Sequence, residues 1–344
     1  MKTRLVPALV LSLSLAGCGT AEVATFPMPD ADYSHLGLSD AEAAGLLSLE
    51  QIDDYPLYTM HHYAEYEYEE YEARSAVPLE TAMPWGCSLF AALSDPASRI
   101  YGRNFDWEFS PALLLFAHPA DGYASVAMVD IAYLGFAGDL SENLTARPVD
   151  ELVGLLDAPY IPFDGLNEAG LVIGMAAVAP GNMPVDPEKE TIGSLGAIRV
   201  MLDKAATVEE ALDILFGYNI DFEGGPPVHY LIADATGDSV LVEYYDGEVH
   251  VFESATAWHQ ATNFLRAAVD SPEGQCRRYD TIAAELEAGR GYLDVDAAMR
   301  LLATVAQSHT QWSVVYNASS GELQVVMGKD FDRVHSLSLD MVAP

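Results

Sequence analysis

The chain has 344 residues, of which 50% are hydrophobic, and a formal net charge of −36 at pH 7. Gly and Pro are too few for a collagen-like or disordered chain, and this length forms one large domain or two smaller ones around a sizeable core. The excess of 52 acidic over 16 basic residues repels nucleic acid and argues against DNA or RNA binding. An acidic surface fits a salty medium and an ordinary soluble protein equally well.

The first residues form a targeting segment. Lys2 and Arg4 precede the apolar run LVPALVLSLSLAG, which is too short to span a bilayer. The run ends in LAGC at Cys18, which resembles the bacterial lipobox, where a peptidase cuts before the cysteine and its thiol receives a lipid. This resemblance implies a lipoprotein signal peptide over residues 1–18 and a protein of the cell envelope, lipid-anchored to a bacterial membrane through Cys18. Gly19 favours the outer membrane of a Gram-negative host, and ordinary secretory cleavage nearby is the alternative.

Residues 19–86 differ in composition from the rest and are interpreted as a leader segment or propeptide. The pattern at 39–52 predicts a helix that begins with a capping box. The Tyr/Glu-rich run at 61–75 predicts a polar helix, on which His61 and His62 are solvated rather than bound to a metal ion.

Residues 87–344 are interpreted as one catalytic body in which strands and helices occur in blocks. Such blocks favour a layered α+β fold over a parallel sheet. Strands are predicted within 99–107, 112–119, 123–136, 170–179, 229–253 and 312–328. Amphipathic helices are predicted at 194–205, 207–217, 276–289 and 294–307.

The cysteines suggest a nucleophile. Cys18, Cys87 and Cys276 are the three in the chain; with Cys18 lipidated, the other two either pair in a disulfide or serve separately. Catalysis is one reason to keep a free thiol in an oxidising compartment. If the bond before Cys87 is cut, its new α-amine, with an ordinary pKa of about 7.7–8.0, lies beside its own thiol. One residue then supplies a nucleophile and a base for attack on an amide.

Arg103 and Asp106 follow Cys87 by 16 and 19 residues. A two-residue turn between the strands would place Asp106 opposite Cys87. Asp106 would then accept a hydrogen bond from the α-ammonium group, and the Arg103 guanidinium would lower the pKa of the thiol. Taken alone, the two residues are equally well explained as a structural ion pair at the end of a strand.

Four motifs occur in order: GCSLFAAL from Gly86, YGRNFDW from Tyr101, DGLNEAGL from Asp164 and ATNF from Ala261. Together they resemble the linear amide C–N hydrolases, an N-terminal-nucleophile group that includes choloylglycine hydrolases, penicillin V acylases, acid ceramidase and acyltransferase-like peptidases. The resemblance covers roughly residues 87–344. It implies an α+β fold, the four-layer αββα sandwich with two antiparallel sheets, an autocatalytic cut and hydrolysis of linear amide bonds.

The resemblance also implies roles for individual residues. Cys87 is the nucleophile exposed by the cut, and Arg103 and Asp106 polarise and orient it. Asn263 in ATNF donates to the oxyanion and holds the region of the α-amine. Arg278 in CRRYDTI buttresses the nucleophile, and Arg277 is the alternative because the two arginines are adjacent. The alternative is that both arginines lie on a surface helix and have no role at the nucleophile.

One position departs from the family pattern. Ala177 stands where bile-salt hydrolases and penicillin V acylases carry Asn or Tyr, so a backbone N–H has to serve as the oxyanion donor there. This departure argues against a bile-salt or penicillin substrate. Asn167 is interpreted as a turn residue rather than a catalyst, with Gly165 and Gly170 in tight turns beside it.

No phosphate-binding loop, HExxH sequence or clustered metal-ligand spacing is present, so we expect no cofactor and no metal ion. The negative field disfavours anionic substrates and favours small neutral or cationic N-acyl amides, such as fatty-acyl amines. Members of the family often form oligomers, which makes a homo-oligomer compatible with the resemblance. The alternatives are an acyltransferase of the same fold and an uncut, non-catalytic envelope binding protein whose Cys87 belongs to the core.

Overall fold

The computed structural model of the protein describes residues 26–66, 86–222 and 224–342. The signal peptide, the lipobox with Cys18 and the part of the Tyr/Glu-rich run beyond Tyr66 lie outside the described residues. Within the described ranges, no helix has the length and apolar character needed to span a membrane.

The smaller of the two large sheets has six strands in the order β14-β3-β4-β15-β16-β17, and all its pairings are antiparallel. It carries the predicted nucleophile at the beginning of β3. Its strands are β3 (Gly86–Ala92), β4 (Ile100–Asp106), β14 (Trp258–Ala261), β15 (Thr310–Asn317), β16 (Glu322–Met327) and β17 (His335–Ser338).

The larger sheet has nine strands in the order β1-β2-β5-β6-β7-β8-β11-β12-β13, with one parallel pairing, between β2 and β5. The strands β9 (Thr191–Gly193) and β10 (Asn219–Asp221) form a separate parallel pair. The nine strands are β1 (Glu50–Asp53), β2 (Leu57–His62), β5 (Ala112–Ala117), β6 (Ser125–Asp130), β7 (Asp164–Asn167), β8 (Val172–Ala177), β11 (Val228–Ala233), β12 (Ser239–Tyr245) and β13 (Glu248–Glu253).

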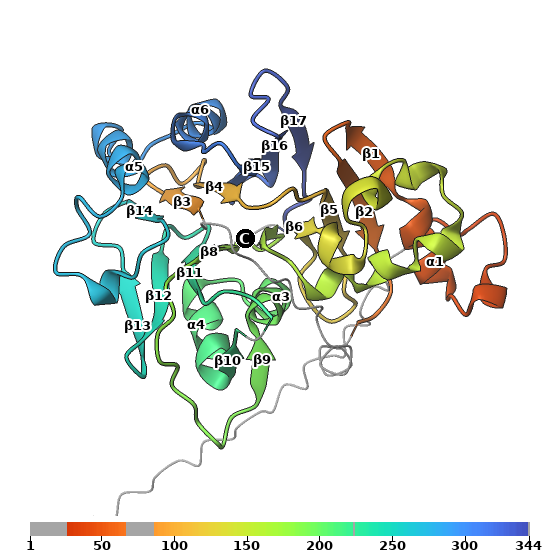
Figure 1. Ribbon diagram of the computed structural model, residues 1–344, viewed down its shortest axis with the longest axis horizontal. Coiled ribbons are helices and arrows are strands. Elements are labelled where there is room, and N and C mark those ends of the chain that lie inside the picture. The colour runs from red at the N-terminus through yellow and green to blue at the C-terminus, as the bar shows by residue number, and fades with distance from the viewer. Residues whose placement is uncertain (1–25, 67–85, 223, 343–344) are drawn as a thin grey trace, which may run out of the picture.

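Helices cover the outer faces of the two sheets and complete the expected αββα order (Figure 1). One helical pair packs on β3, β4, β14 and β15 and the other on β7, β8 and β11. The first pair is α5 (Arg277–Ala288) and α6 (Val295–Val305); the second is α3 (Ser194–Lys204) and α4 (Val208–Gly217). Outside these layers lie α1 (Asp40–Leu47) and the 3-10 helices η1 (Ser34–Leu36), η2 (Ile131–Leu134), η3 (Gly138–Ser141), η4 (Leu144–Ala146), η5 (Val149–Glu151), η6 (Val153–Tyr160) and η7 (Arg266–Ala268).

The main core lies between the two sheets. Leu89 on β3 and Tyr101 on β4 face Gly174 on β8, where an added Cβ would lie 2.7 Å from both side chains. The Tyr101 hydroxyl donates a hydrogen bond of 2.9 Å to the carbonyl oxygen of Leu231 on β11. Because glycine leaves this space, the sheets approach closely and a buried hydrogen bond joins them.

Several predicted elements are confirmed. The helices expected at 194–205, 207–217, 276–289 and 294–307 form as α3, α4, α5 and α6. The predicted hairpin between β12 and β13 turns at Asp246 and Gly247, whose φ angles of 53° and 80° suit a type I′ turn. Gly170 has the φ of 91° that its turn requires, whereas Gly165 lies within β7 and not in a turn.

Two predictions for the leader segment, residues 19–86, were wrong. The helix expected over 39–52 ends at Leu47, because residues 50–53 pair with β2 instead. His61 and His62 belong to β2 rather than to a polar helix, and His62 is buried. Neither change has a local signal, because each depends on a neighbouring strand that lies elsewhere in the sequence.

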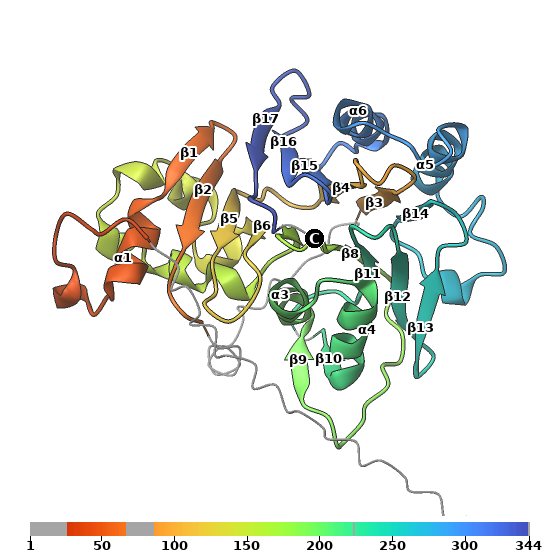
Figure 2. The ribbon, with the colours of Figure 1, turned by 180° about the vertical axis from the view of Figure 1, so that it is seen from behind.

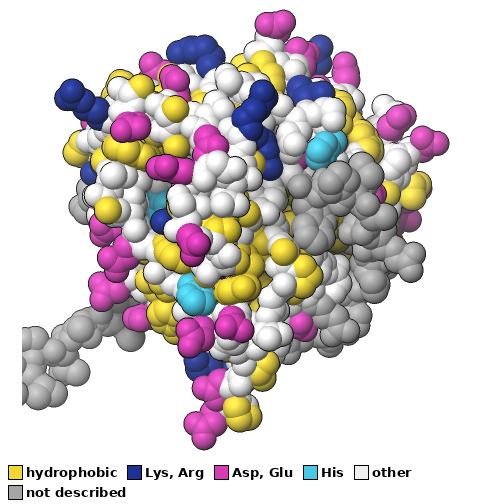
Figure 3. Space-filling view, turned by 60° about the vertical axis from the view of Figure 1, so that its left-hand side comes forward, with side chains coloured by type: hydrophobic (Ala, Val, Ile, Leu, Met, Phe, Trp, Pro, Cys, Tyr) yellow, Lys and Arg dark blue, Asp and Glu magenta, His cyan; other side chains and the backbone are white. Residues whose placement is uncertain are grey.

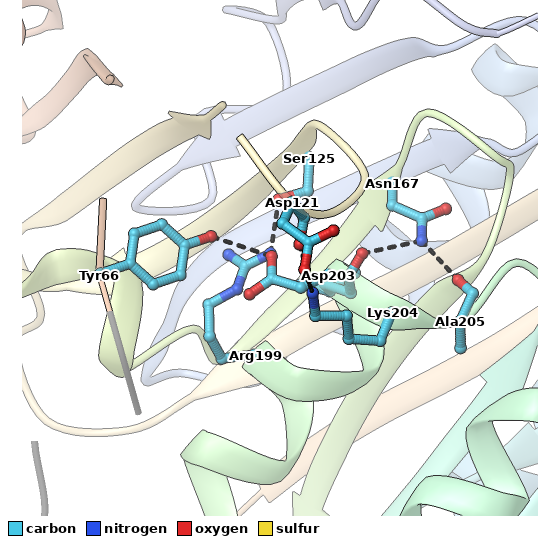
Figure 4. Close-up of polar contacts among 9 residues, drawn as sticks. Tyr66, Asp121, Ser125, Asn167, Arg199, Asp203, Lys204 and Ala205 are labelled. Atoms are coloured by element: carbon cyan, nitrogen blue, oxygen red, sulfur yellow. Dashed lines mark hydrogen bonds and ion pairs between the residues drawn. The ribbon is translucent and has the colours of Figure 1, made fainter. Parts of the chain in front are cut away.

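The described part of the leader segment is built into the fold. Strand β2 lies between β1 and β5 and pairs with β5 at six positions, from Leu57 opposite Ala112 to His62 opposite Ala117. Beyond β2, the Tyr66 hydroxyl donates a 2.9 Å hydrogen bond to Asp203 on α3 (Figure 4). The leader segment therefore contributes interior sheet structure.

The same close-up shows how α3 is fixed at its end (Figure 4). Buried Arg199 donates to Asp203 at 2.6 Å and to the Ser125 hydroxyl at 2.8 Å. The Asn167 amide donates to the carbonyl oxygens of Leu202 and Ala205, and its oxygen accepts from the backbone N–H of Leu171. Asn167 thus closes a turn and caps a helix, which agrees with its interpretation as a structural residue.

His62 should make folding depend on pH. Its side chain is buried beside the ring of Tyr66, with 5.5 Å between the ring centroids. Burial, aided by the charge of Arg199, lowers the pKa of His62 to about 4. The unfolded residue takes up its proton below pH of about 6.5, so the stability it contributes is complete above that pH and falls as pH drops towards 4, by about 3 kcal/mol.

The measurement is the thermal midpoint of unfolding at pH 7.5 and pH 5 for the wild type and for His62→Leu. We expect a smaller loss on acidification in the variant, because Leu takes up no proton in the unfolded chain. His118 and His259 are unchanged in both proteins and cancel in the comparison. Equal losses in the two proteins would contradict the prediction.

Candidate active site

Cys87 and Asp106 lie at one end of the six-stranded sheet. In the ladder between β3 and β4, Asp106 is opposite Gly86 and Cys87 is opposite Phe105. The expected two-residue turn is wrong, because residues 93–99 connect the strands. The register nevertheless brings Asp106 beside the bond that precedes Cys87.

A cavity of about 140 Å³ opens at Cys87 between the two sheets. Cys87 and Arg103 are among its lining residues, and most of the exposed lining surface is apolar. The cavity is about the size that holds one benzene-sized group. Its aromatic and aliphatic walls include Phe105, Trp107, Tyr133, Phe163, Met175 and Leu195.

Asn263 and Arg278 hold the backbone of the predicted nucleophile. The backbone N–H of Cys87 donates to Asn263 Oδ1 at 2.6 Å. Arg278 donates through Nη1 to the Cys87 carbonyl oxygen and to the Ser88 hydroxyl, and through Nη2 to Asn263 Oδ1 at 3.0 Å. Arg277 is exposed, so Arg278 is the arginine of the pair that reaches the nucleophile.

The different positions of Arg277 and Arg278 predict different effects of mutating them. Arg278→Gln removes a charged donor to three groups at the site, and we expect it to lower kcat about 30-fold or more. Arg277→Gln removes an exposed charge and should leave kcat within about twofold of wild type. Steady-state kinetics of both variants test the assignment, and equal losses would contradict it.

Asp106 is fully buried and accepts two side-chain hydrogen bonds. Thr310 donates to Oδ1, and Gln307 donates to Oδ2 at 2.7 Å. Burial raises the pKa of Asp106, although the two hydrogen bonds oppose the increase. A Cβ at Gly86 would lie 1.8 Å from Gln307 Nε2 and 3.1 Å from Asp106 Oδ2, so residue 86 has no room for a side chain.

Arg103 faces the cavity, but its main partner is Asp164 on β7. The guanidinium forms a fully buried ion pair with Asp164 and donates to the carbonyl oxygen of Phe163 at 2.7 Å. The Tyr316 hydroxyl donates to the other Asp164 oxygen at 2.5 Å. Nε and Nη2 of Arg103 are buried and have no partner within the described ranges.

The Cys87 thiol is protonated while the chain is uncut. Burial raises the pKa of the thiol, and the nearby Arg103 charge only partly offsets this effect. A thiol in this environment needs a base before it attacks a carbonyl carbon. Opening the preceding peptide bond would supply that base as an α-amine.

The sequence profile of the linear amide C–N hydrolases, choloylglycine hydrolase family, matches residues 87–264. The match begins at Cys87 and covers just over half of the chain. The protein belongs to this family. The resemblance noted from four motifs is thereby confirmed.

Individual relatives agree with the assignment. This family member is 25% identical to the penicillin V acylase of Pectobacterium atrosepticum in an alignment 195 residues long, which covers 52% of this chain and 50% of that protein. The chain therefore spans about half the length of this curated relative.

Solved structures confirm the N-terminal-nucleophile hydrolase fold. A mutant conjugated bile acid hydrolase from Clostridium perfringens has a TM-score of 0.50 at 16% identity, covering 74% of this chain and 92% of that chain. Penicillin V acylase from Agrobacterium tumefaciens has a TM-score of 0.51 at 15% identity, covering 74% of this chain and 87% of that chain.

Ala177 lines the cavity at Cys87 and contacts Asn263 through its backbone. Asn263 Nδ2 donates to the Ala177 carbonyl oxygen at 2.8 Å, so β8 orients the asparagine through its backbone rather than through a side chain.

Cys87 and Cys276 are both free thiols, so the two cysteines do not pair in a disulfide. Among the residues that the structure describes, no group of three or more His, Cys, Asp or Glu side chains is arranged to hold a metal ion.

Sequence reasoning missed several residues of the site. Gln307 and Thr310 lie where α6 passes into β15, and neither belongs to a recognisable motif. Asp164 stands in the DGLNEAGL motif, yet its pairing with Arg103 depends on the contact between the two sheets. The sequence signal for Asp164 was an acidic residue at the first position of a family motif.

Proposed function

We propose that this protein is an N-terminal-cysteine amidase, which cuts its own chain before Cys87 and then hydrolyses linear amide bonds of N-acyl substrates. One observation carries the proposal. The Cys87 thiol lines an apolar cavity while its backbone nitrogen donates to Asn263, beside the Asp106 carboxylate. Cys87 would thus supply both the nucleophile and the base, and it lines the cavity that would hold the substrate.

The first reaction is maturation. The Cys87 sulfur attacks the carbonyl carbon of Gly86, the C–N bond breaks, and the acyl group moves to sulfur as a thioester while the α-amine is released. Water then hydrolyses the thioester and leaves a Gly86 carboxylate and a free Cys87 thiol. Asp106, beside Gly86 in the ladder, stabilises the new α-ammonium group, and glycine at position 86 avoids a collision with Gln307.

Turnover repeats this chemistry on a substrate. The α-amine of Cys87 accepts the thiol proton, the sulfur attacks the amide carbon, and the same proton passes to the departing amine. Water hydrolyses the resulting thioester to the carboxylic acid. The proposed oxyanion donors are the side-chain amide of Asn263, which already accepts from the Cys87 nitrogen, and the two unpartnered nitrogens of Arg103.

The cavity and the charge together suggest the substrate class. Its apolar walls suit the uncharged end of an acyl group, one ring or a short stretch of chain. Acidic side chains are spread over the face in Figure 3, whereas most of the visible Lys and Arg side chains lie in its upper part. A net charge of −36 favours a neutral or cationic amine over an anionic one.

We further propose an envelope location, with a lipid on Cys18 as the anchor. The leader segment would keep the catalytic body attached after the cut, since β2 is hydrogen-bonded on both sides, to β1 and to β5. Losing it would leave the β5 edge unpaired and the apolar residues of β2 exposed, which is unfavourable.

The test uses the full chain, purified and incubated. Mass spectrometry should find an N-terminus at Cys87, with the leader segment in the same gel-filtration peak. The processed protein should release amine from neutral N-acyl amines faster than from conjugated bile salts or penicillin V. Added hydroxylamine separates hydrolysis from acyl transfer to an amine. An intact chain without amidase activity would refute the proposal in favour of a binding protein.

A further inference from the structure

The turn between β1 and β2 of the leader segment packs against the catalytic body beside β17 (Figure 2). Buried Asp53 lies 2.6 Å from His335 Nε2 and accepts from Arg333 Nη1 at 3.2 Å. The ring of Tyr55 meets Phe109 edge to face, with 5.5 Å between ring centroids. The polar contacts of Asp53 and the aromatic contact of Tyr55 therefore hold this turn on the catalytic body.

Tyr55 reaches the catalytic body through its hydroxyl. The hydroxyl donates to Gln311 Oε1 at 2.7 Å. The ring lies against Gly328, where a Cβ would come within 2.7 Å of it. The surface under Tyr55 is thus shaped to accept its ring, and the hydroxyl is directed to a buried amide.

Gln311 occupies a β-bulge at the active site. In the ladder of β15 with β4, Thr310 is opposite Asp106 and Trp312 is opposite Phe105, so Gln311 is the extra residue. Bulges of this kind redirect neighbouring side chains and disturb the regular ladder, so they depend on other contacts for their shape.

The Gln311 side chain supplies such contacts. Its Nε2 donates to the carbonyl oxygens of Trp107 and His309, each at 2.8 Å. Its Oε1 accepts from Tyr55 and from the backbone N–H of Ser110, the latter at 3.2 Å. Both amide hydrogens and both acceptor positions are in use, so the amide has one orientation.

The backbone that Gln311 holds carries two parts of the site. Trp107 lines the cavity at Cys87. Thr310, next to Gln311, donates to the buried Asp106 carboxylate. A shift of the bulge would move the wall of the cavity and the hydroxyl that orients Asp106 together.

From these contacts we propose that Tyr55 is a positioning residue of the amidase, acting on Asp106 and Trp107 through Gln311. The leader segment is then a working part of the processed enzyme and not only its pro-region. This inference rests on the proposed function. Tyr55 touches neither substrate nor nucleophile, and its effect comes from fixing the bulge.

The chain offers a matched control in Tyr58. Its hydroxyl donates to the Ser141 carbonyl oxygen at 2.7 Å and, like that of Tyr55, joins the leader segment to the catalytic body. Tyr58 packs in a separate core cluster with Leu113 and Val129, and it does not line the cavity. Tyr55→Phe and Tyr58→Phe each remove one tyrosine hydroxyl from the leader segment. Only the hydroxyl of Tyr55 contacts the bulge at Gln311.

The experiment compares kcat and KM of the two processed variants with wild type, per Cys87 thiol titrated. Tyr55→Phe should lower kcat about tenfold and change KM less than threefold. Tyr58→Phe should keep kcat within twofold, whatever its thermal midpoint. In the double variant of Tyr55→Phe with Gln311→Ala, kcat should fall no further than in Gln311→Ala alone, because the two residues act as one unit.

Unchanged kcat in Tyr55→Phe, or equal losses in the two Tyr→Phe variants, would overturn the inference while leaving the amidase assignment intact. If Gln311→Ala does not fold, the comparison of the two Tyr→Phe variants decides alone. A wild-type protein that is neither cut nor active would overturn the proposed function, and this inference with it.

Discussion

Cys87→Ala is expected to abolish both maturation and amide hydrolysis. Alanine has no sulfur to attack the Gly86 carbonyl, so the chain stays intact, and without a thiol no acyl-enzyme forms. Cys87 is buried as the second residue of β3, and the smaller side chain leaves β3 and its ladders in place. The expected loss of turnover is at least about 10⁴-fold, measured by mass spectrometry and amine release.

Two controls accompany this variant. Cys276→Ala removes the other free thiol among the described residues and should mature and turn over normally. Cys87→Ser keeps an oxygen nucleophile that is much less acidic than a thiol, so a slow cut with poor turnover is expected. Turnover by an intact Cys87→Ala chain would remove the basis for the proposed mechanism.

Asp106→Asn is expected to lower kcat by about 100-fold or more and to slow maturation. The variant keeps the size of the side chain but loses the charge that faces the new α-ammonium group. It also places an NH₂ group where Thr310 or Gln307 now donates, so a buried hydrogen bond is lost.

The matched control is Glu108→Gln, which removes an exposed carboxylate two residues further along the chain. Its kcat should stay within about twofold of wild type. Steady-state kinetics and the rate of appearance of the Cys87 N-terminus measure both effects. Normal maturation and turnover in Asp106→Asn would show that the carboxylate does not act on the nucleophile.

Much of the catalytic body could be predicted because its signals are local. Runs of strand-favouring residues with turn residues between them located β4, β5 and β8, and the spacing of apolar residues located α3 to α6. The family motifs singled out Cys87, Asp106 and Asn263, which the structure brings together at one end of a sheet. Their catalytic roles stay predictions until the variants are measured.

The remaining features depend on contacts between distant segments. His62 is buried because β2 pairs with β5, and this pairing cannot be predicted from residues 57–62 alone. Gln311 owes its importance to a bulge, and a bulge is a mismatch between two strands rather than a feature of either. Of the adjacent arginines, only the geometry of α5 selects Arg278.

The parallel alignment of β2 with β5 has a practical consequence for producing the protein. A gene shortened to begin at codon 87 would omit two strands that the finished sheet needs. The polypeptide made from it would present bare backbone donors and acceptors along β5, a template for self-association during refolding. The natural order of synthesis delivers β1 and β2 first, before the strand that they must meet has left the ribosome.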